Sequence, residues 1–282
     1  MNAQTLLLDS LNTRWDKYKT ELKICQVEFS EAAVHDLRVA TRRLLSSLDL
    51  LRAAVTDPRI QKIRRVLKDQ LDNLDDLRNI QALLADISEI IHETPELQPY
   101  QEYLQYREKK LLRTARKEIK SLKIEGLSKR IKKLNQTIET FEQANRDVSL
   151  LSAVDGAYAI VNQRYGLVDP AQPATIHHLR LAFKKFRYMV EVVHPILEDF
   201  PSRSLKRMHN YQAAMGDIQD MEVALQELAD FGETAPANYD PEPARAYYKE
   251  RHAIALSRYI EDKGEIITFW RSAPDQLFPE EK

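Results

Sequence analysis

The sequence predicts an all-α protein made of two pseudo-symmetric four-helix bundle halves joined by a linking helix. Only six of the 282 residues are glycine and β-branched runs are few, which favours helix over sheet. Apolar residues recur at helical spacing along most of the chain. One pattern, VHDLRVATRRL at 34–44, returns as IHHLRLAFKKF at 176–186. An internal repeat on this scale predicts two similar bundles related by an approximate twofold axis.

Four helices are predicted in the first half. They span residues 2–27, 30–55, 59–92 and 99–123. Ser30 is suited to cap the second helix, which carries the repeated pattern. Asp57 followed by Pro58 suits the start of the third helix, as cap and first helical residue. Pro95 and Pro99 separate the third helix from the fourth.

A linking helix from about Gly126 to Gln143 leads into the second half. The helices predicted there span residues 146–165, 174–199, 202–231 and 244–270. Prolines mark their boundaries, and Pro195 is expected to kink the second of them or end it early. The prediction is one domain with repeat halves 1–143 and 144–270 and a C-terminal tail 271–282.

The repeated pattern places a line of cations on each of its two helices. At about 3.6 residues per turn, positions i, i+3 and i+7 share one side of a helix. The two stripes are His35, Arg38 and Arg42 in the first half, and His177, Arg180, Lys184 and, one turn on, Arg187 in the second. Arg43 and Lys185 lie about 100° around the helix, where they edge the site or face water. A twofold axis could bring both stripes onto one surface.

The doubled pattern H-x-x-R-x-x-x-[RK]-[RK] resembles the conserved histidine α-helical domain (CHAD) family. The second copy is the closer one, because it continues through Arg187, Tyr188 and Glu191 as R-Y-x-x-E. A short family pattern, L-G-x-x-x-D, is similar to residues 215–220 in the second half and 74–79 in the first. The resemblance implies an all-helical domain of two similar halves that binds inorganic polyphosphate through basic side chains. It also implies frequent fusion to a CYTH triphosphatase domain, which is not expected in this chain.

Polyphosphate offers repeated acceptor oxygens and no base edge or apolar face, so cations along a line should recognise it. Arginine supplies a planar fork and lysine a compact point charge. The histidines could link binding to proton uptake, because neighbouring arginines favour the neutral ring and a bound phosphate favours the charged one. Glu191, Asp220 and Tyr188 are assigned supporting roles. For the two carboxylates, simple structural ion pairs or solvated side chains are the alternative.

The first half departs from the pattern. Leu45 stands where the second half has Arg187, and Asn79 stands where it has Asp220. Three further differences are Ser46 for Tyr188, Asp49 for Glu191 and Asp75 for Gly216. The first stripe is therefore shorter, and the second half is expected to contribute more to binding.

A second basic region begins within the fourth predicted helix and continues into the linking helix. It contains Arg107, Lys109, Lys110, Arg113, Arg116, Lys117, Lys120, Lys123, Lys129, Arg130, Lys132 and Lys133. Such a run is usually a solvated face, but the line that begins at Arg107 could face the same groove as the stripes. Lys206 opens the third helix of the second half at the place that matches Arg64, and we expect it to contact phosphate.

Composition narrows the setting. No apolar run approaches the roughly 20 residues of a membrane span, and the N-terminus has no basic n-region. The lone cysteine, Cys25, fits a reducing cytoplasm. We therefore expect a cytoplasmic protein that does not bind a membrane. Its expected partner is inorganic polyphosphate, and a polyphosphate-associated protein complex or granule is left open as a further one.

Other functions fit the sequence less well. A metal site on His35 and His177 would have cations as neighbours, and there is no H-E-x-x-H pattern or cysteine pair. An enzyme that cleaves phosphoanhydrides normally needs a divalent ion held by carboxylates or an activated nucleophile, and the sequence has no P-loop pattern and no paired-carboxylate motif beside the stripes. Nucleic acid or another polyanion is the nearest alternative, because tyrosines near Arg107 could stack with bases. The prediction is a non-catalytic polyphosphate-binding module without a cofactor or metal.

Overall fold

The computed structural model describes residues 2–140, 146–201, 203–236 and 239–279. Within these ranges the secondary structure is helical, with no strand. The elements are α1 (Ala3–Val27), α2 (Glu31–Ala54), α3 (Pro58–Asp72), α4 (Asp75–Ile90), η1 (Pro95–Leu97), α5 (Gln98–Ser121), α6 (Glu125–Glu139), α7 (Arg146–Tyr165), α8 (Pro173–Val193), η2 (His194–Ile196), α9 (Ser204–Gly232), α10 (Glu242–Asp262) and η3 (Lys263–Thr268). The predicted all-α class is confirmed.

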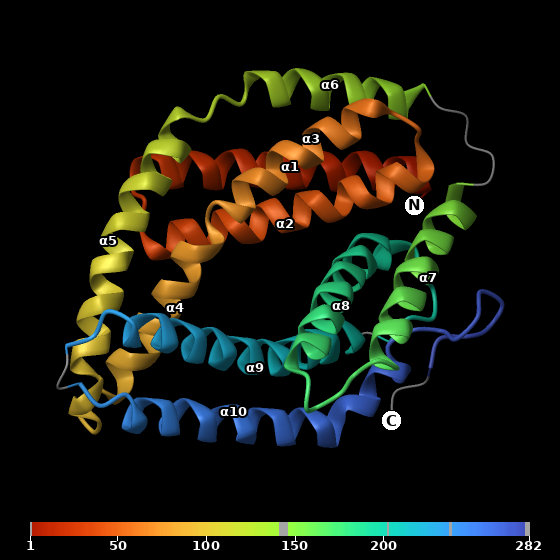
Figure 1. Ribbon diagram of the computed structural model, residues 1–282. Helices are drawn as coiled ribbons and strands as arrows, with labels where there is room; N and C mark the ends of the chain where they lie inside the picture. Colours follow the sequence, from red (N-terminus) through yellow and green to blue (C-terminus); the bar gives the residue numbers. More distant parts are fainter. Residues whose placement is uncertain (1, 141–145, 202, 237–238, 280–282) are drawn as a thin grey trace.

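The helices form an upper and a lower group (Figure 1). α1, α2, α3 and α6 lie together at the top, and α4, α9 and α10 lie below. α5 runs down one edge and α7 down the other, with α8 beside α7. The two motif helices, α2 and α8, pack against each other and against α7. The two copies of the repeated pattern are therefore in contact within the molecule.

The predicted helix starts at Ser30 and Asp57 are confirmed. The Ser30 hydroxyl accepts a hydrogen bond from the Ala33 N–H at 3.2 Å. The Asp57 carboxylate accepts one from the Arg59 N–H at 2.8 Å, with Pro58 in the first turn. Both caps satisfy amide groups that a helix leaves without an internal partner.

The third predicted helix, 59–92, is two helices. The break falls at Asn73 and Leu74, between α3 and α4. Leucines at helical spacing run through this point, so the pattern gave no sign of it. The cause is tertiary: Leu74 is buried, α3 packs on α2 and α6, and α4 turns away to pack on α5 and α9. Its counterpart α9 stays continuous.

Two other predicted boundaries were wrong, and a third lies outside the described residues. The joint before the linking helix lies at residues 122–124, and Gly126 sits in the first turn of α6. The end predicted near Gln143 falls outside the described residues, because α6 closes at Glu139. The last helix stops at Asp262 and not at residue 270, since the chain tightens into η3 and turns the rings of Phe269 and Trp270 into the core. Pro195 does end α8 early, within η2.

The hydrophobic core is shared between the halves. One buried cluster joins α1, α2, α3 and α6 to α7 and α8, and a second joins α4 and α5 to α9 and α10. Part of the predicted tail also packs, because Phe278 lies against Phe200 and Trp270, with ring centroids 5.3 and 4.9 Å apart. No described helix has the length and apolar character that crossing a bilayer would demand.

Candidate functional site

The motif helices are joined by two reciprocal ion pairs. Arg43 Nε lies 3.8 Å from Glu191 Oε2, and Lys185 Nζ lies 3.7 Å from Asp49 Oδ2. In the repeat, Arg43 corresponds to Lys185 and Asp49 to Glu191. In each half, the basic residue at one position of the repeat pairs with the carboxylate at the equivalent position of the other half. An approximate twofold axis between α2 and α8 requires this reciprocity.

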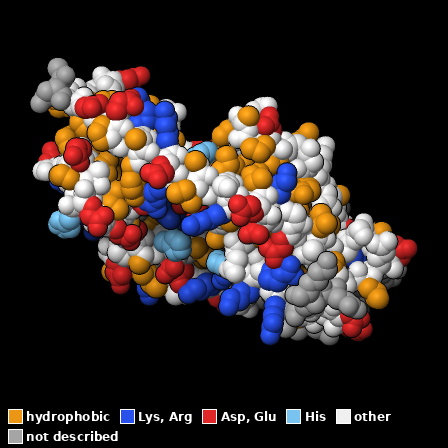
Figure 2. All heavy atoms as spheres, turned by 90° about the horizontal axis from the view of Figure 1, so that it is seen from below, with side chains coloured by type: hydrophobic (Ala, Val, Ile, Leu, Met, Phe, Trp, Pro, Cys, Tyr) orange, Lys and Arg blue, Asp and Glu red, His pale blue; other side chains and the backbone are white. Residues whose placement is uncertain are grey.

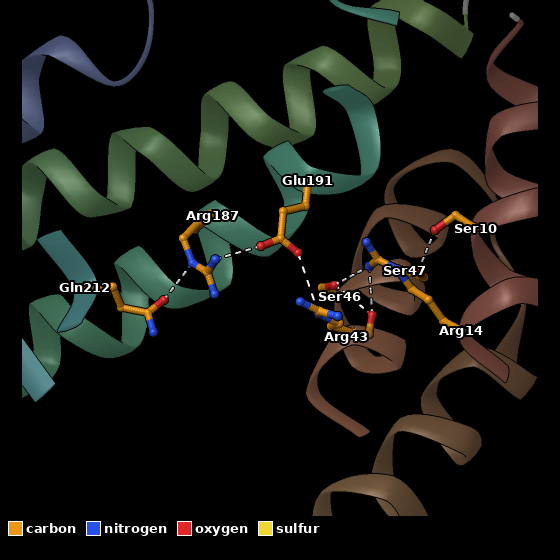
Figure 3. A network of polar contacts seen from close by, with 8 residues as sticks. All are labelled: Ser10, Arg14, Arg43, Ser46, Ser47, Arg187, Glu191 and Gln212. Atoms are coloured by element: carbon orange, nitrogen blue, oxygen red, sulfur yellow. Dashed lines mark hydrogen bonds and ion pairs between the residues drawn. The ribbon is translucent and has the colours of Figure 1, made fainter. Parts of the chain in front are cut away.

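Glu191 holds two arginines, as its predicted supporting role requires (Figure 3). Besides Arg43 it accepts a 2.7 Å hydrogen bond from Arg187 Nη1. Arg187 Nε donates to Gln212 Oε1 at 2.9 Å, and its guanidinium lies 4.6 Å from the centre of the Tyr188 ring. Arg187 is only 7% exposed, so these contacts favour a positioning role over direct contact with phosphate.

Arg14 also belongs to this network, although the sequence gave no sign of it. Its Nη1 donates to the Arg43 carbonyl and to the Ser46 hydroxyl, both at 2.8 Å. Burial lowers the pKa of Arg14 to about 10, while the nearby Glu191 raises it. Arg14 lines a cavity of about 460 Å³ between α1, α2 and α8.

The two predicted stripes come together in a cationic cluster. We define this cluster as Arg38 and Arg42 of α2, Arg78 of α4, and Arg180 and Lys184 of α8. Burial, followed by the charges of Arg42, Arg180 and Arg38, lowers the pKa of Lys184 to about 6. The surroundings of Lys184 thus favour its neutral form in the free protein.

One carboxylate contacts the first-half stripe. Arg38 donates to Asp75 Oδ1, and Arg42 Nη2 lies 3.5 Å from the same oxygen. Arg38 is only 5% exposed, and burial lowers its pKa to about 10, with Arg42 adding to the effect. The sequence marked Asp75 only as a replacement for glycine, so this role was missed.

The second-half stripe is arranged differently. The Arg180 guanidinium lies over Gly216, where a Cβ would come 3.7 Å from its Nε and Nη2. Arg180 Nε is buried, and no hydrogen-bond partner for it is found in the described part of the chain. Burial lowers the pKa of Arg180, although the charge of Asp220 raises it.

Arg78 is the cation that the sequence reasoning overlooked. Its charge lowers the pKa of His35 and Arg180 and opposes the burial that raises the pKa of Asp220. A signal was available, since Arg78 stands one residue before Asn79 in the first copy of the L-G-x-x-x-D pattern. In the second copy of this pattern the equivalent residue is Gln219.

The two motif histidines have different neighbours. His177 Nδ1 is hydrogen-bonded to Gln219 Oε1. His35 is exposed, and partial burial of its ring followed by the charge of Arg78 lowers its pKa. The direction of this shift is the one expected from neighbouring arginines. In the described residues no three His, Cys, Asp or Glu side chains gather as metal ligands would.

A cavity of about 560 Å³ adjoins the cationic cluster at Arg78 and Asp220. Its wall has mixed charge, with Arg251 and Arg258 of α10 facing Asp86 and Asp217. Asp217 and Asp220 line this cavity, and their partial enclosure by the protein raises the pKa of both. The underside of the molecule, seen in Figure 2, likewise intermixes blue and red side chains.

The remaining predicted site residues lie elsewhere. Arg107 forms an ion pair with Glu227 of α9 and lies 5.9 Å from the centre of the Tyr103 ring. Lys110, Arg113 and Lys117, predicted to share its line, are exposed on α5. Lys206 is exposed near the start of α9.

Comparison with known proteins identifies one family. Residues 14–229, more than half of the chain, match the family described as CHAD domain. A solved structure, the CHAD domain from the plant Ricinus communis, is 17% identical in sequence. The alignment covers 99% of this chain and 94% of that one, with a TM-score of 0.67. The curated proteins contain no match.

Proposed function

The chain belongs to the CHAD domain family, and we propose that it binds inorganic polyphosphate, without chemistry, in a basic groove formed around the cationic cluster. The family is associated with polyphosphate. The observation that carries the proposal is the cluster itself: five basic side chains from three helices, of which Arg38 and Arg42 contact the carboxylate of Asp75.

Free-state electrostatics support an anionic ligand. The cluster holds Lys184 among like charges, which disfavours its protonated form. The buried Arg180 Nε lacks a hydrogen-bond acceptor in the described residues, and an unmet buried donor costs about 1–3 kcal/mol. A phosphate at this place would relieve both costs, since its oxygens accept hydrogen bonds and its charge offsets the cations.

The cluster combines the basic stripes of both halves, and this suits a chain of phosphates better than a single phosphate. Cations of two related helices meet across a local twofold axis, so phosphates on either side find similar partners. The ligand needs no base or apolar group, because arginine forks and a lysine supply charge and donors only. We propose that binding takes place in the cytoplasm, with a polyphosphate-associated complex or granule as a further partner.

Single-stranded nucleic acid is the second candidate ligand, and the outward side of α5 is the observation that favours it. The exposed cations on this side are Lys109, Lys110, Arg113, Arg116, Lys117 and Lys120. At about 100° per residue they share one arc of the helix. Tyr106, which is 69% exposed, lies within that arc and offers a ring for base stacking.

The test is a titration of the wild type and three variants with long-chain polyphosphate and with single-stranded DNA at two salt concentrations. The variants are Arg180→Ala/Lys184→Ala, His35→Ala/His177→Ala, and a matched control on α5, Lys109→Ala/Arg113→Ala. We expect tight polyphosphate binding that the first variant loses and the control keeps. Salt will weaken every electrostatic complex, so the ranking of ligands and variants decides. Preferred binding of DNA, lost only in the α5 variant, would replace the proposal with the nucleic-acid candidate.

A further inference from the structure

The two halves of the cationic cluster differ by one carboxylate. Asp75 and Gly216 occupy equivalent places in the repeat, at the second position of the L-G-x-x-x-D pattern. In the first half, Asp75 Oδ1 accepts from Arg38 and lies 3.5 Å from Arg42 Nη2. In the second half there is no side chain at this place, and Arg180 lies over the glycine.

We propose that Asp75 is a built-in counter-anion that occupies the phosphate position of the first half. The equivalent position of the second half, where Arg180 lies over Gly216 and no carboxylate is present, is the subsite that takes the first phosphate of a chain, with Lys184 beside Arg180. This inference rests on the proposed function and adds to it which half is filled first and what limits the other half.

The hydrogen-bonding state of the two arginines supports this division. Arg38 is buried and already has a carboxylate partner. Arg180 has a buried Nε for which the described residues supply no acceptor. An incoming phosphate oxygen therefore gains an unmet donor at Arg180, whereas at Arg38 it must compete with Asp75.

Lys184 and its counterpart Arg42 differ in the same way as Arg180 and Arg38. Arg42 is held 3.5 Å from Asp75. No ion pair of Lys184 with a carboxylate is found among the described side chains; Asp75 acts on it only from a distance and less strongly than the charges of Arg42, Arg180 and Arg38. A phosphate is the group that this position lacks.

The second half also has a carboxylate, but one helical turn further along. Asp220 corresponds to Asn79, four residues after the Asp75 and Gly216 position. It attracts Arg180, yet the described contacts include no ion pair between the two, and Asp220 lines the adjoining cavity. Asp220 therefore does not take the place that Asp75 has in the first half.

The experiment compares Asp75→Asn and Gly216→Asp with Gly216→Ala as the matched control, by calorimetric titration with tripolyphosphate. Asp75→Asn removes a charge beside the ligand and keeps an oxygen for Arg38, so binding should tighten on the order of tenfold. Gly216→Asp puts a carboxylate against Arg180, so binding should weaken on the order of tenfold. The alanine Cβ would lie 3.7 Å from Arg180, an ordinary contact, so Gly216→Ala should stay within about twofold of the wild type.

Thermal unfolding of each variant shows whether it folds, and the glycine pair gives an answer even if Asp75→Asn is unstable. Gly216→Asp binding as well as Gly216→Ala, or a folded Asp75→Asn binding no tighter than the wild type, would overturn the inference and leave the proposed function standing. If neither the wild type nor Asp75→Asn binds tripolyphosphate or long-chain polyphosphate, the inference and the proposed function are both refuted. Binding by Asp75→Asn alone would support Asp75 as the group that blocks the site.

Discussion

Polyphosphate binding should draw a proton onto Lys184. In the free protein burial lowers the pKa of this amine to about 6, and the charges of Arg42, Arg180 and Arg38 act in the same direction. Asp75 on α4 is the facing carboxylate that opposes them. A phosphate beside Lys184 would favour the ammonium form and return its pKa towards the ordinary value of about 10.5.

The size of the effect follows from this pKa. With a pKa of about 6 in the free protein, Lys184 is about 99% neutral at pH 8. Each occupied site should therefore take up about one proton at pH 8, and about half a proton at pH 6. Above pH 6 the affinity should fall as pH rises, by at most about tenfold per pH unit, until the pKa of the bound state is reached.

The assay is calorimetric titration with long-chain polyphosphate at pH 8, in two buffers with different enthalpies of ionisation. Long chains are used because their internal phosphates do not titrate in this range, and at pH 8 the histidines contribute least. The slope of the observed enthalpy against the buffer ionisation enthalpy gives the number of protons taken up.

Lys184→Arg is the matched control, because the first half has Arg42 at the equivalent place. Arginine stays charged, so this variant should bind polyphosphate without proton uptake. Binding by the wild type with no proton uptake, or equal uptake by Lys184→Arg, would refute the reasoning.

Four further predictions concern affinity and stability. Arg180→Ala/Lys184→Ala should weaken polyphosphate binding more than Arg38→Ala/Arg42→Ala, because Asp75 already occupies the latter pair; equal losses in titration would contradict this. Lys184→Met should raise the midpoint of thermal unfolding more at pH 5 than at pH 8. The folded-state pKa lies below the unfolded one, so the cost of the charged amine is complete below pH 6 and declines as pH rises towards 10.5; an equal gain at both pH values would contradict it. Glu191→Gln should cost about 1–3 kcal/mol in urea unfolding, because it leaves the buried Arg187 without its carboxylate; an unchanged midpoint would show that this network adds no stability. Phe278→Ala should cost about 1–2 kcal/mol, since the ring is partly buried against Phe200 and Trp270; no loss would restore the view of this segment as a tail.

Local features of the sequence predicted the helices well. Ser30 and Asp57 mark helix starts because a side-chain oxygen beside a free amide is a local arrangement. The break between α3 and α4 left no such mark. It depends on α5 and α9, which lie far from it in sequence and hold α4 in a new direction.

The repeat also predicted part of the site. It identified the two stripes and the unequal halves, because equivalent positions can be compared letter by letter. It assigned no role to Asp75, Arg78 or Arg14, since their importance lies in what they contact. Arg187 shows the reverse case, in which a residue that fits the pattern is buried and paired with Glu191.

The sequence alone determined the helical class, the internal repeat and the residue types that occupy equivalent positions in its two copies. Helical periodicity and repetition are properties of neighbouring residues, so they can be read without the fold. Only the tertiary structure decided which charges meet. Charge interactions depend on distance and burial between helices, and these set Asp75 against Arg38 and left Lys184 among cations.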